Sequence, residues 1–243
     1  MDLVLQAGEL LLTSGAEIYR VEETIERMGR AAGFVQVEGF ATPTGLFISL
    51  HAPGGQVYTR VRRTRQSRNN LAVIAAINSL SRDFSEGQVT AQEVKGRLAV
   101  LAGAGNPESL KRQLMGGGGA MAFTLIFGGS WFEAGVAGVI GALVLTAVSF
   151  LERYPVPKVL QSAIGGMIAA AAALGLAEVL PIHPDLTTLG AVMVMTPGVA
   201  MTTAIRDLLS GELLSGLSRA AEALVVSVAI ATGVAIVISL GGR

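Results

Sequence analysis

Residues 134–151 read AGVAGVIGALVLTAVSFL, a run of 18 residues without a charged side chain. An α-helix rises about 1.5 Å per residue, so this run is long enough to cross a hydrocarbon layer of roughly 30 Å. Every backbone polar group in hydrocarbon must be satisfied internally, and the Ala, Gly, Leu and Val content favours a helix over a barrel strand. The run therefore predicts a membrane-spanning helix.

Uncharged runs of similar length occupy most of the chain after residue 113. A helix buried in a soluble core could explain one such run, but five in succession are typical of a membrane domain. We predict five membrane-spanning helices, at about residues 113–132, 134–151, 159–178, 186–205 and 219–241.

Charged residues are concentrated in the first part of the chain. The whole sequence has a mean hydropathy of +0.57 and 15% charged residues, which is too apolar for an average soluble domain. Residues 1–112 nevertheless hold 24 of its 36 charged side chains. We therefore predict an α-helical integral membrane protein in which a small α+β cytoplasmic domain, residues 1–112, precedes a transmembrane domain, residues 113–243. The connecting loop is expected near residues 105–112.

Composition also narrows the chemistry. The absence of cysteine excludes disulfides and thiolate metal sites, and a formal net charge of zero does not favour binding to nucleic acid. Asp2 and Glu9 interrupt the N-terminal apolar run, unlike a secretory signal. The sequence shows no clustered set of metal ligands, so we predict neither a metal nor another cofactor.

The loops between the predicted spans alternate in charge. Lys and Arg are retained on the cytoplasmic side of a membrane, so the loops that carry them predict the orientation. On one side these residues are Lys111, Arg112, Arg153, Lys158, Arg206 and Arg219. The alternate loops carry Glu133, Glu178, His183 and Asp185, and only Arg243 departs from the pattern. We predict a cytoplasmic N-terminus and a C-terminus on the outside.

The fourth predicted span is interrupted by Pro197-Gly198. Proline removes a backbone donor and clashes with the preceding turn, so the helix should break there. A broken membrane helix exposes backbone groups and half-helix ends that transporters use to hold polar substrates. Hydroxyls of Thr196, Thr202 and Thr203 surround the break. The alternative is a simple kink whose freed carbonyls are satisfied by neighbouring helices.

Two carboxylates adjoin long apolar runs near this break. Asp207 and Glu222 would be costly to keep ionised beside hydrocarbon, so either could carry a proton. The alternative is an ion pair at the membrane interface, for example of Asp207 with Arg206 or Arg219.

The N-terminal domain is predicted to contain helices and a small sheet. Apolar positions at helical spacing predict one helix over residues 3–32, with Glu17 and Glu22 bordering its apolar face. These carboxylates either meet another functional element or pair with arginines of the strands. Strands are expected at 34–40, 46–51 and 56–61, the last two joined by a hairpin turn, and further helices at 67–82 and 90–102.

An arginine cluster begins within the third predicted strand and continues beyond it. Contact with anionic lipid headgroups or plain solvation is favoured over nucleic-acid binding, because Tyr58 is the only stacking aromatic nearby. The cluster comprises Arg60, Arg62, Arg63, Arg65 and Arg68.

A membrane-tethered hydrolase is an alternative from another class. His51 and His183 fall on opposite sides of the membrane in the predicted topology, and no Gly-x-Ser-x-Gly motif accompanies either histidine. We predict that the protein is not an enzyme. A membrane sensor with a ligand-binding cytoplasmic domain stays open.

Two separated motifs resemble the hallmarks of the threonine/serine exporter family. They are SGAEIYRVEET at residues 14–24 and PGVAMTTAIRDLLSGELLSGLSRAAE at residues 197–222, and the resemblance covers nearly the whole chain. TPTG at residues 42–45 resembles a further feature of the family. The resemblance implies export of small metabolites across the inner membrane, driven by the proton-motive force.

The family resemblance also implies partners. Full-length exporters carry a second group of spans, whereas this chain is similar to the split form, in which a long chain works with a small multi-span membrane protein. Split members include pairs implicated in succinate export. The expected partners are therefore the bilayer, an amino acid or dicarboxylate substrate, a second copy of the chain and/or the small subunit, and no nucleic acid.

These observations predict a set of site residues. The substrate would be held by Thr196, Pro197, Gly198, Thr202, Thr203 and Arg206. Asp207 or Glu222 would couple transport to protons, and a cytoplasmic gate would consist of Glu17, Arg20 and Glu22. A dicarboxylate would need a cation such as Arg206 or Arg219, whereas a zwitterionic amino acid needs both signs, and the sequence leaves this choice open.

Overall fold

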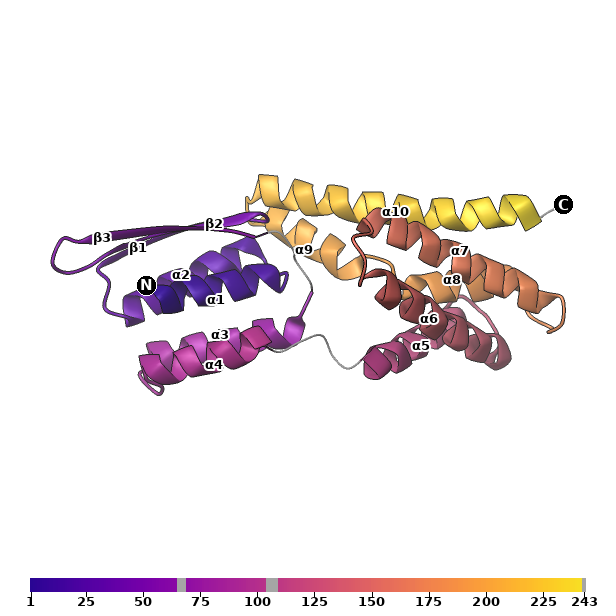
Figure 1. Ribbon diagram of the computed structural model, residues 1–243, viewed down its shortest axis with the longest axis horizontal. Coiled ribbons are helices and arrows are strands. Elements are labelled where there is room, and N and C mark those ends of the chain that lie inside the picture. The colour runs from indigo at the N-terminus through magenta and orange to yellow at the C-terminus, as the bar shows by residue number, and fades with distance from the viewer. Residues whose placement is uncertain (65–68, 104–108, 242–243) are drawn as a thin grey trace. The chain divides into compact units, whose positions relative to one another are not determined.

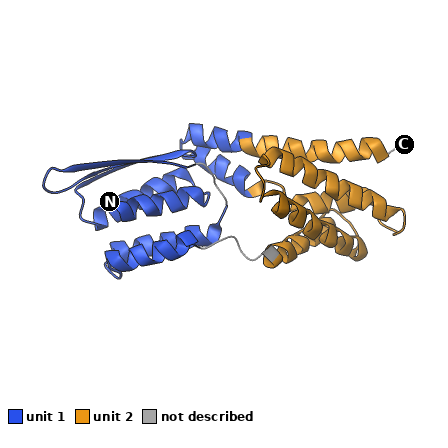
Figure 2. Ribbon diagram, in the orientation of Figure 1, with its two compact units in different colours: residues 1–105, 199–221 blue, residues 106–198, 222–243 orange. Residues whose placement is uncertain are grey.

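The computed structural model describes residues 1–64, 69–103 and 109–241 (Figure 1). The chain divides into two compact units, coloured separately in Figure 2. Unit 1 contains residues 1–105 and 199–221, and unit 2 contains residues 106–198 and 222–243. The unit that holds the polar N-terminal part therefore also takes a segment from far along the chain.

Unit 1 combines helices with a three-stranded antiparallel sheet of order β1-β2-β3. Its elements are α1 (Asp2–Thr13), α2 (Ile18–Ala31), β1 (Gln36–Thr42), β2 (Gly45–His51), β3 (Val57–Arg63), α3 (Leu71–Ser85), α4 (Ala91–Gly103), nearly all of α9 (Gly198–Leu209) and the start of α10 (Leu213–Gly241).

The single helix predicted over residues 3–32 is wrong, because the chain leaves the helical conformation between Thr13 and Ile18. Gly15 has a φ of +82°, a left-handed conformation that commonly closes a helix. An ideal Cβ on Gly15 would lie 2.4 Å from Asn69 Oδ1, so a side chain there would also clash. The apolar spacing continued through the break because α1 and α2 pack into the same core.

The sheet follows the predicted strands to within about two residues at each end. Leu46, Ile48 and Leu50 alternate along β2 and are buried in the core with residues of α1 and α2. The turn before β3 contains Gly55 at a φ of +80°, as the predicted hairpin requires. Strand β3 is exposed along its whole length.

Two other expectations concern the segment after β3. Helices α3 and α4 begin at Leu71 and Ala91, whereas residue 67, where the first was expected to begin, lies outside the described residues. In the arginine cluster, Arg60, Arg62 and Arg63 are exposed on β3, while Arg65 and Arg68 lie outside the described residues. Arg62 forms an ion pair with Glu9 of α1 at 3.4 Å.

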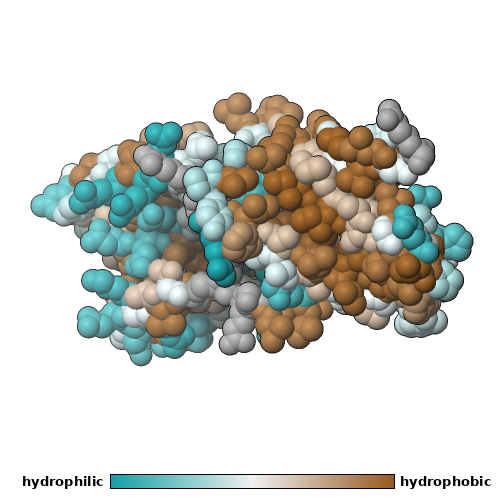
Figure 3. Space-filling model, turned by 45° about the vertical axis from the view of Figure 1, so that its right-hand side comes forward, coloured by the Kyte–Doolittle hydropathy of each residue, from teal (hydrophilic) through white to brown (hydrophobic). Residues whose placement is uncertain are grey.

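Unit 2 is helical. It contains α5 (Ser109–Ile126), α6 (Trp131–Leu151), α7 (Lys158–Ala177), α8 (Pro184–Met193) and α10 from residue 222 onward. Figure 3 shows apolar side chains gathered over this part of the molecule and hydrophilic ones over unit 1. Exposed apolar side chains on α6 and α10, such as Val139 and Val228, suit contact with lipid.

The expected number of five spans is not confirmed. Within the described residues, α6, α7 and α10 are long and apolar enough to cross a membrane, and a fourth span is possible if the bent pair α8 and α9 is counted as one. Helix α5 contains Lys111, Arg112 and four consecutive glycines and ends at Ile126, which makes it shorter and less apolar than the predicted first span. Helix α10 begins at Leu213, earlier than expected.

Glycines allow α7 and α10 to approach at the level of their backbones. An ideal Cβ on Gly166 would lie 2.5 Å from the carbonyl oxygen of Ile230, and one on Gly233 would lie 2.1 Å from that of Ala163. Small residues at such crossings are the usual means of close helix packing in membranes.

We expect Gly166→Ala to destabilise the protein by about 1–3 kcal/mol, because the added methyl group must push the two helices apart. Gly175→Ala is the matched control on the same helix, since nothing lies within 4 Å of its ideal Cβ. The control should be neutral or slightly stabilising, because alanine favours a helix. Thermal unfolding in detergent compares the two variants, and equal midpoints would contradict the role assigned to Gly166.

Candidate functional site

The two sequence motifs, far apart in the chain, meet inside unit 1. The segment between α1 and α2, residues 14–17, contacts side chains of α9 and α10. We call this contact the junction and the segment Ser14–Glu17 the linker. The hydrogen bonds of the junction join residues 189 to 204 positions apart, and they include one between Asp207 and the N–H of Ile18, the residue directly after the linker.

Asp207 of α9 lies at the centre of the junction and is 0% exposed. Its Oδ1 accepts a 3.2 Å hydrogen bond from the backbone N–H of Ile18, at the N-terminus of α2. Its Oδ2 lies 3.1 Å from Nε of Arg219. These two atoms form an ion pair by distance but not an aligned hydrogen bond, so their attraction is mainly coulombic.

Arg219 of α10 joins Asp207 to the linker. Its side chain is 11% exposed, and Nη2 donates a 2.8 Å hydrogen bond to the carbonyl oxygen of Ala16. Nη1 lies 3.5 Å from the carbonyl oxygen of Gly15. The planar guanidinium can thus contact a carboxylate and the linker backbone at the same time. A lysine ammonium lacks this planar arrangement of donors and could not make both contacts as well.

A tight helical hairpin brings Asp207 and Arg219 together. Gly211 closes α9 at a φ of +88°, and Glu212 donates its N–H to the carbonyl oxygen of Asp207 at 2.8 Å. An ideal Cβ on Gly216 would lie 2.5 Å from Cγ of Leu208, so glycine at this position lets α10 pack closely on α9.

Glu17 is shared between two arginines. Its Oε2 accepts a 3.0 Å hydrogen bond from Nε of Arg20, and its Oε1 accepts one of 2.9 Å from Nη1 of Arg206. Burial of this carboxyl group raises its pKa, but hydrogen bonds from its own backbone N–H and from Arg206 and Arg20 outweigh burial, and the pKa is lowered overall. Glu17 therefore stays ionised at neutral pH.

Glu22 has a different environment from Glu17. Burial raises the pKa of its carboxyl group, a hydrogen bond from the N–H of Ala41 opposes this, and the nearby carboxylate of Glu212 raises it further. The 2.8 Å bond to Ala41 ties α2 to β1. In the part of the chain that the structure describes, Glu17 and Glu22 do not pair with strand arginines, because Glu17 contacts Arg20 and Arg206 and Glu22 contacts the backbone of Ala41.

The break in the fourth predicted span is confirmed. Helix α8 ends at Met193 and α9 begins at Gly198. Thr196 lies in the break, and its hydroxyl is directed to the carbonyl oxygen of Val192 on α8, at 3.5 Å. Thr196 and Pro197 belong to unit 2, whereas the other predicted substrate residues after Gly198 belong to unit 1.

On α9 the predicted residues occupy two faces. Thr203 is buried, like Asp207 one turn further along. Thr202 and Arg206 are exposed, and the hydroxyl of Thr202 donates to the carbonyl oxygen of Val199 at 2.9 Å. The exposed face therefore carries the hydroxyl and the guanidinium that a substrate could reach.

Glu222 is not brought to the junction. It lies in unit 2, its side chain is 61% exposed, and its Oε1 accepts a 3.2 Å hydrogen bond from Nζ of Lys158 on α7. Of the two predicted proton carriers, only Asp207 is buried.

The sequence analysis treated Glu133 and His183 only as loop charges. Glu133 is buried and forms a capping box with Ser130 at the start of α6. Its Oε1 also accepts a 2.8 Å hydrogen bond from the backbone N–H of His183. The same oxygen lies 2.7 Å from Nδ1 of the His183 ring. The Ser-x-x-Glu spacing before an apolar run was the available signal for the cap.

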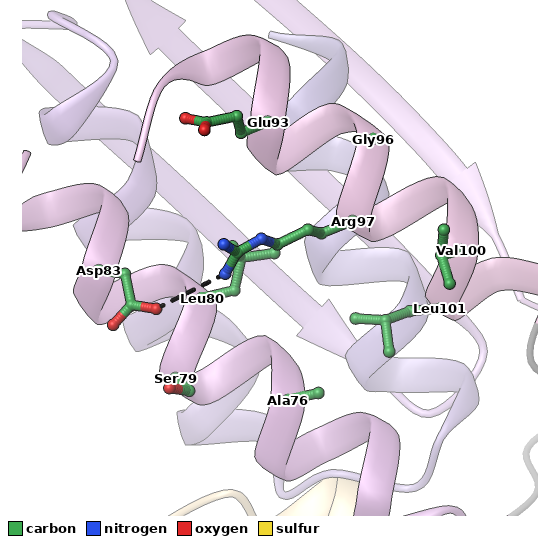
Figure 4. A pocket seen from close by; sticks show the side chains of 9 residues that line it. All are labelled: Ala76, Ser79, Leu80, Asp83, Glu93, Gly96, Arg97, Val100 and Leu101. Carbon is green, nitrogen blue, oxygen red and sulfur yellow. Dashed lines mark ion pairs between the residues drawn. The ribbon is translucent and has the colours of Figure 1, made fainter. Parts of the chain in front are cut away.

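A separate pocket of about 530 Å³ lies between α3 and α4 (Figure 4). Asp83 and Arg97 face one another in it at 4.0 Å, and the rest of its wall is mostly apolar. It contains none of the predicted site residues. Among the described residues, no group of three or more His, Asp or Glu side chains is arranged to hold a metal ion.

The apolar helices of unit 2 and the buried ionic junction of unit 1 define the class of this chain. It is a helical membrane protein with a polar unit built from residues 1–105 and 199–221.

Sequence comparison assigns the family. Residues 2–241 match the family model described as "Putative threonine/serine exporter", so the chain belongs to the threonine/serine exporter family. Both motifs of the junction fall inside this match.

Individual relatives carry two different descriptions. The chain is 25% identical to the "Probable succinate transporter subunit YjjP" of Escherichia coli strain K12, over 99% of this chain and 94% of the relative. It is 22% identical to the "Probable threonine/serine exporter" of Mycobacterium tuberculosis and to the "Threonine/serine exporter" of Corynebacterium glutamicum. The chain spans 46% and 51% of the length of these two relatives. No solved structure is significantly similar.

Proposed function

We propose that this chain is a subunit of a secondary exporter that uses the proton-motive force to move small polar metabolites out of the cytoplasm. The observation that carries the proposal is the buried ion pair of Asp207 and Arg219, which holds the linker to α9 and α10. A carboxylate withdrawn from water beside a short non-helical segment is suited to linking proton binding to a conformational change.

The substrate path in this proposal includes the broken α8–α9 segment and the exposed face of α9. Thr196, Pro197 and Gly198 supply the break. On α9 the exposed Thr202 and Arg206 supply a hydroxyl and a cation, and the hydroxyl of Thr203 comes from the buried face that also carries Asp207. Glu17, Arg20 and Glu22 form the cytoplasmic gate. Arg206 belongs to both groups, because Glu17 occupies its guanidinium.

Asp207 is the proposed proton carrier, in preference to Glu222. A carboxylate without solvent contact responds strongly to a change in its partners, whereas Glu222 is mostly exposed and paired with an exposed lysine side chain. Ionisation of Asp207 favours the contact with Arg219, and protonation weakens it.

The proposed substrate is a zwitterionic amino acid, threonine or serine, and the alternative is a dicarboxylate such as succinate. The family description supports the first, and the description of one relative as a succinate transporter subunit supports the second. The junction offers both signs of charge, with Arg20, Arg206 and Arg219 beside Glu17 and Asp207.

We further propose that the protein is a multi-pass protein of the inner membrane, with its N-terminus in the cytoplasm and its C-terminus outside. Ion pairs Arg112–Glu152 and Lys158–Glu222 involve the basic residues that the orientation rule assigns to the cytoplasmic side. We also propose that the chain works with a small multi-span membrane partner, with further copies of itself, or with both, and the description of one relative as a transporter subunit supports the existence of a partner.

Efflux into everted membrane vesicles tests the proposed function. Vesicles with the chain, with and without the small membrane partner, should accumulate labelled threonine or serine when a proton gradient is applied. Succinate tests the dicarboxylate alternative in parallel. A sensor would move none of the three compounds, and a hydrolase would change the compound chemically instead of moving it.

A further inference from the structure

The carboxylate of Glu17 has two cationic partners, one on each oxygen. Arg20 lies one turn along the same helix, and Arg206 comes from α9, 189 residues away. Either arginine alone could neutralise the carboxylate. Loss of the Arg206 contact would therefore not leave Glu17 without a counter-charge.

Arg206 is the accessible arginine of α9 and α10 at the junction. Its side chain is 63% exposed, and its described ion pair is with Glu17. Arg219 is 11% exposed, with its guanidinium directed to Asp207 and to the carbonyl oxygens of the linker. A dissolved carboxylate could reach Arg206 without disturbing the buried pair.

We propose that Glu17 is an internal competitor for the substrate: it occupies Arg206 when the site is empty, and an entering substrate carboxylate displaces it onto Arg20. The inference rests on the proposed function, because it assigns the substrate carboxylate to one residue of that site. It also resolves the choice between Arg206 and Arg219 that the sequence left open.

The exchange costs little free energy, because the substrate carboxylate replaces the carboxylate of Glu17 on Arg206. Arg206 keeps a charge-assisted hydrogen bond throughout, and Glu17 keeps the 3.0 Å bond to Arg20. The free energy lost with the internal pair is that of a partly exposed ion pair, up to about 1 kcal/mol, which corresponds to roughly a fivefold change in affinity.

The exchange also provides a gate. Glu17 is the residue that precedes α2, and it ends the linker whose carbonyl groups Arg219 holds. Release from Arg206 removes the hydrogen bond between Glu17 and α9, while the contacts of Arg219 with Gly15 and Ala16 persist. Substrate arrival would thus remove one of the contacts that hold the linker and the start of α2 to α9 and α10, and protonation of Asp207 would weaken another.

Three variants of the full-length purified protein test this exchange by calorimetric titration with L-threonine and with succinate. Glu17→Gln removes the competing charge and should tighten binding about two- to fivefold. Arg20→Ala removes the alternative partner of Glu17 and should weaken binding by a similar factor. In the Glu17→Gln/Arg20→Ala double variant the effect of Arg20→Ala should disappear, because the displaced carboxylate no longer exists.

The direction in which Glu17→Gln changes the binding affinity tests the proposal most directly. If Glu17 contacts the substrate directly, or if its role is only structural, Glu17→Gln should weaken binding or leave it unchanged, and either result overturns the proposal. An effect of Arg20→Ala that persists in the double variant also overturns it. If Glu17→Gln lowers the thermal unfolding midpoint, Arg20→Ala in the wild-type background still tests the proposal, since unchanged binding would contradict it.

The binding titration and the vesicle assay can distinguish failure of the carboxylate exchange from failure of the proposed function. Tighter binding by Glu17→Gln without efflux in vesicles would retain the carboxylate exchange and remove the exporter assignment. Efflux by the wild type with no tightening of binding by Glu17→Gln would retain the exporter assignment and remove the carboxylate exchange. Absence of both binding and efflux would overturn both proposals.

Discussion

Replacing Arg219 by alanine is expected to destabilise the protein by about 3–5 kcal/mol, the usual effect of leaving a buried charge without its partner. Asp207 has no solvent contact, and the nearest cation is Arg219 at 3.1 Å. The variant would also lose the 2.8 Å hydrogen bond that Arg219 donates to the carbonyl oxygen of Ala16. Unfolding of the purified protein in detergent measures the change.

Two controls separate the buried pair from a general loss of charge. Arg206→Ala removes an arginine of the same junction, but its side chain is mostly exposed, so the expected change is below about 1 kcal/mol. Arg219→Lys keeps the charge without the planar fork and should fall between the two. Equal unfolding midpoints for Arg219→Ala and Arg206→Ala would show that the buried pair does not stabilise the fold.

Replacing Asp207 by asparagine is expected to reduce efflux to the level of vesicles that lack the protein. Asparagine has nearly the same shape and can still accept the hydrogen bond from Ile18 through its amide oxygen. It cannot take up and release a proton in the physiological range, so the coupling step is lost. Asparagine also leaves the largely buried Arg219 without its counter-charge and so lowers stability, and efflux is therefore normalised to the abundance that immunodetection measures in the membrane fraction.

Asp185→Asn is the matched control for this variant. Asp185 lies in the first turn of α8, is exposed, and has no part in the junction, so efflux should continue. Undiminished efflux by Asp207→Asn would remove Asp207 from the mechanism. Loss of efflux in Glu222→Gln but not in Asp207→Asn would transfer proton coupling to the Lys158–Glu222 pair.

Local chemistry made several elements of the fold predictable. Uncharged runs predicted α6 and α7 almost to their ends, because backbone satisfaction in hydrocarbon depends on composition over about 20 residues. Pro197-Gly198 predicted the break before α9 for an equally local reason, the missing donor and the clash with the preceding turn. The hairpin before β3 followed from its glycines.

Other elements depended on contacts with distant segments. The break between α1 and α2 was missed because both helices bury apolar residues in the same core, so the helical spacing runs through the linker. The first predicted span was overestimated because an absence of charge does not make a glycine-rich stretch strongly apolar. The start of α10 was placed too late, since Arg219 was read as a loop residue although it is paired inside the fold.

The sequence by itself determined that this chain belongs in a membrane and that its fourth predicted span breaks at Pro197-Gly198. It also determined which two motifs carry charged residues beside apolar segments. Those properties follow from hydropathy and backbone chemistry, which act over a few turns. Only the tertiary structure decided how the charges pair. It buried Asp207 against Arg219, left Arg206 exposed beside Glu17, and moved Glu222 to another unit. Pairing depends on which side chains the folded backbone brings within about 4 Å, and spacing along the chain does not specify this.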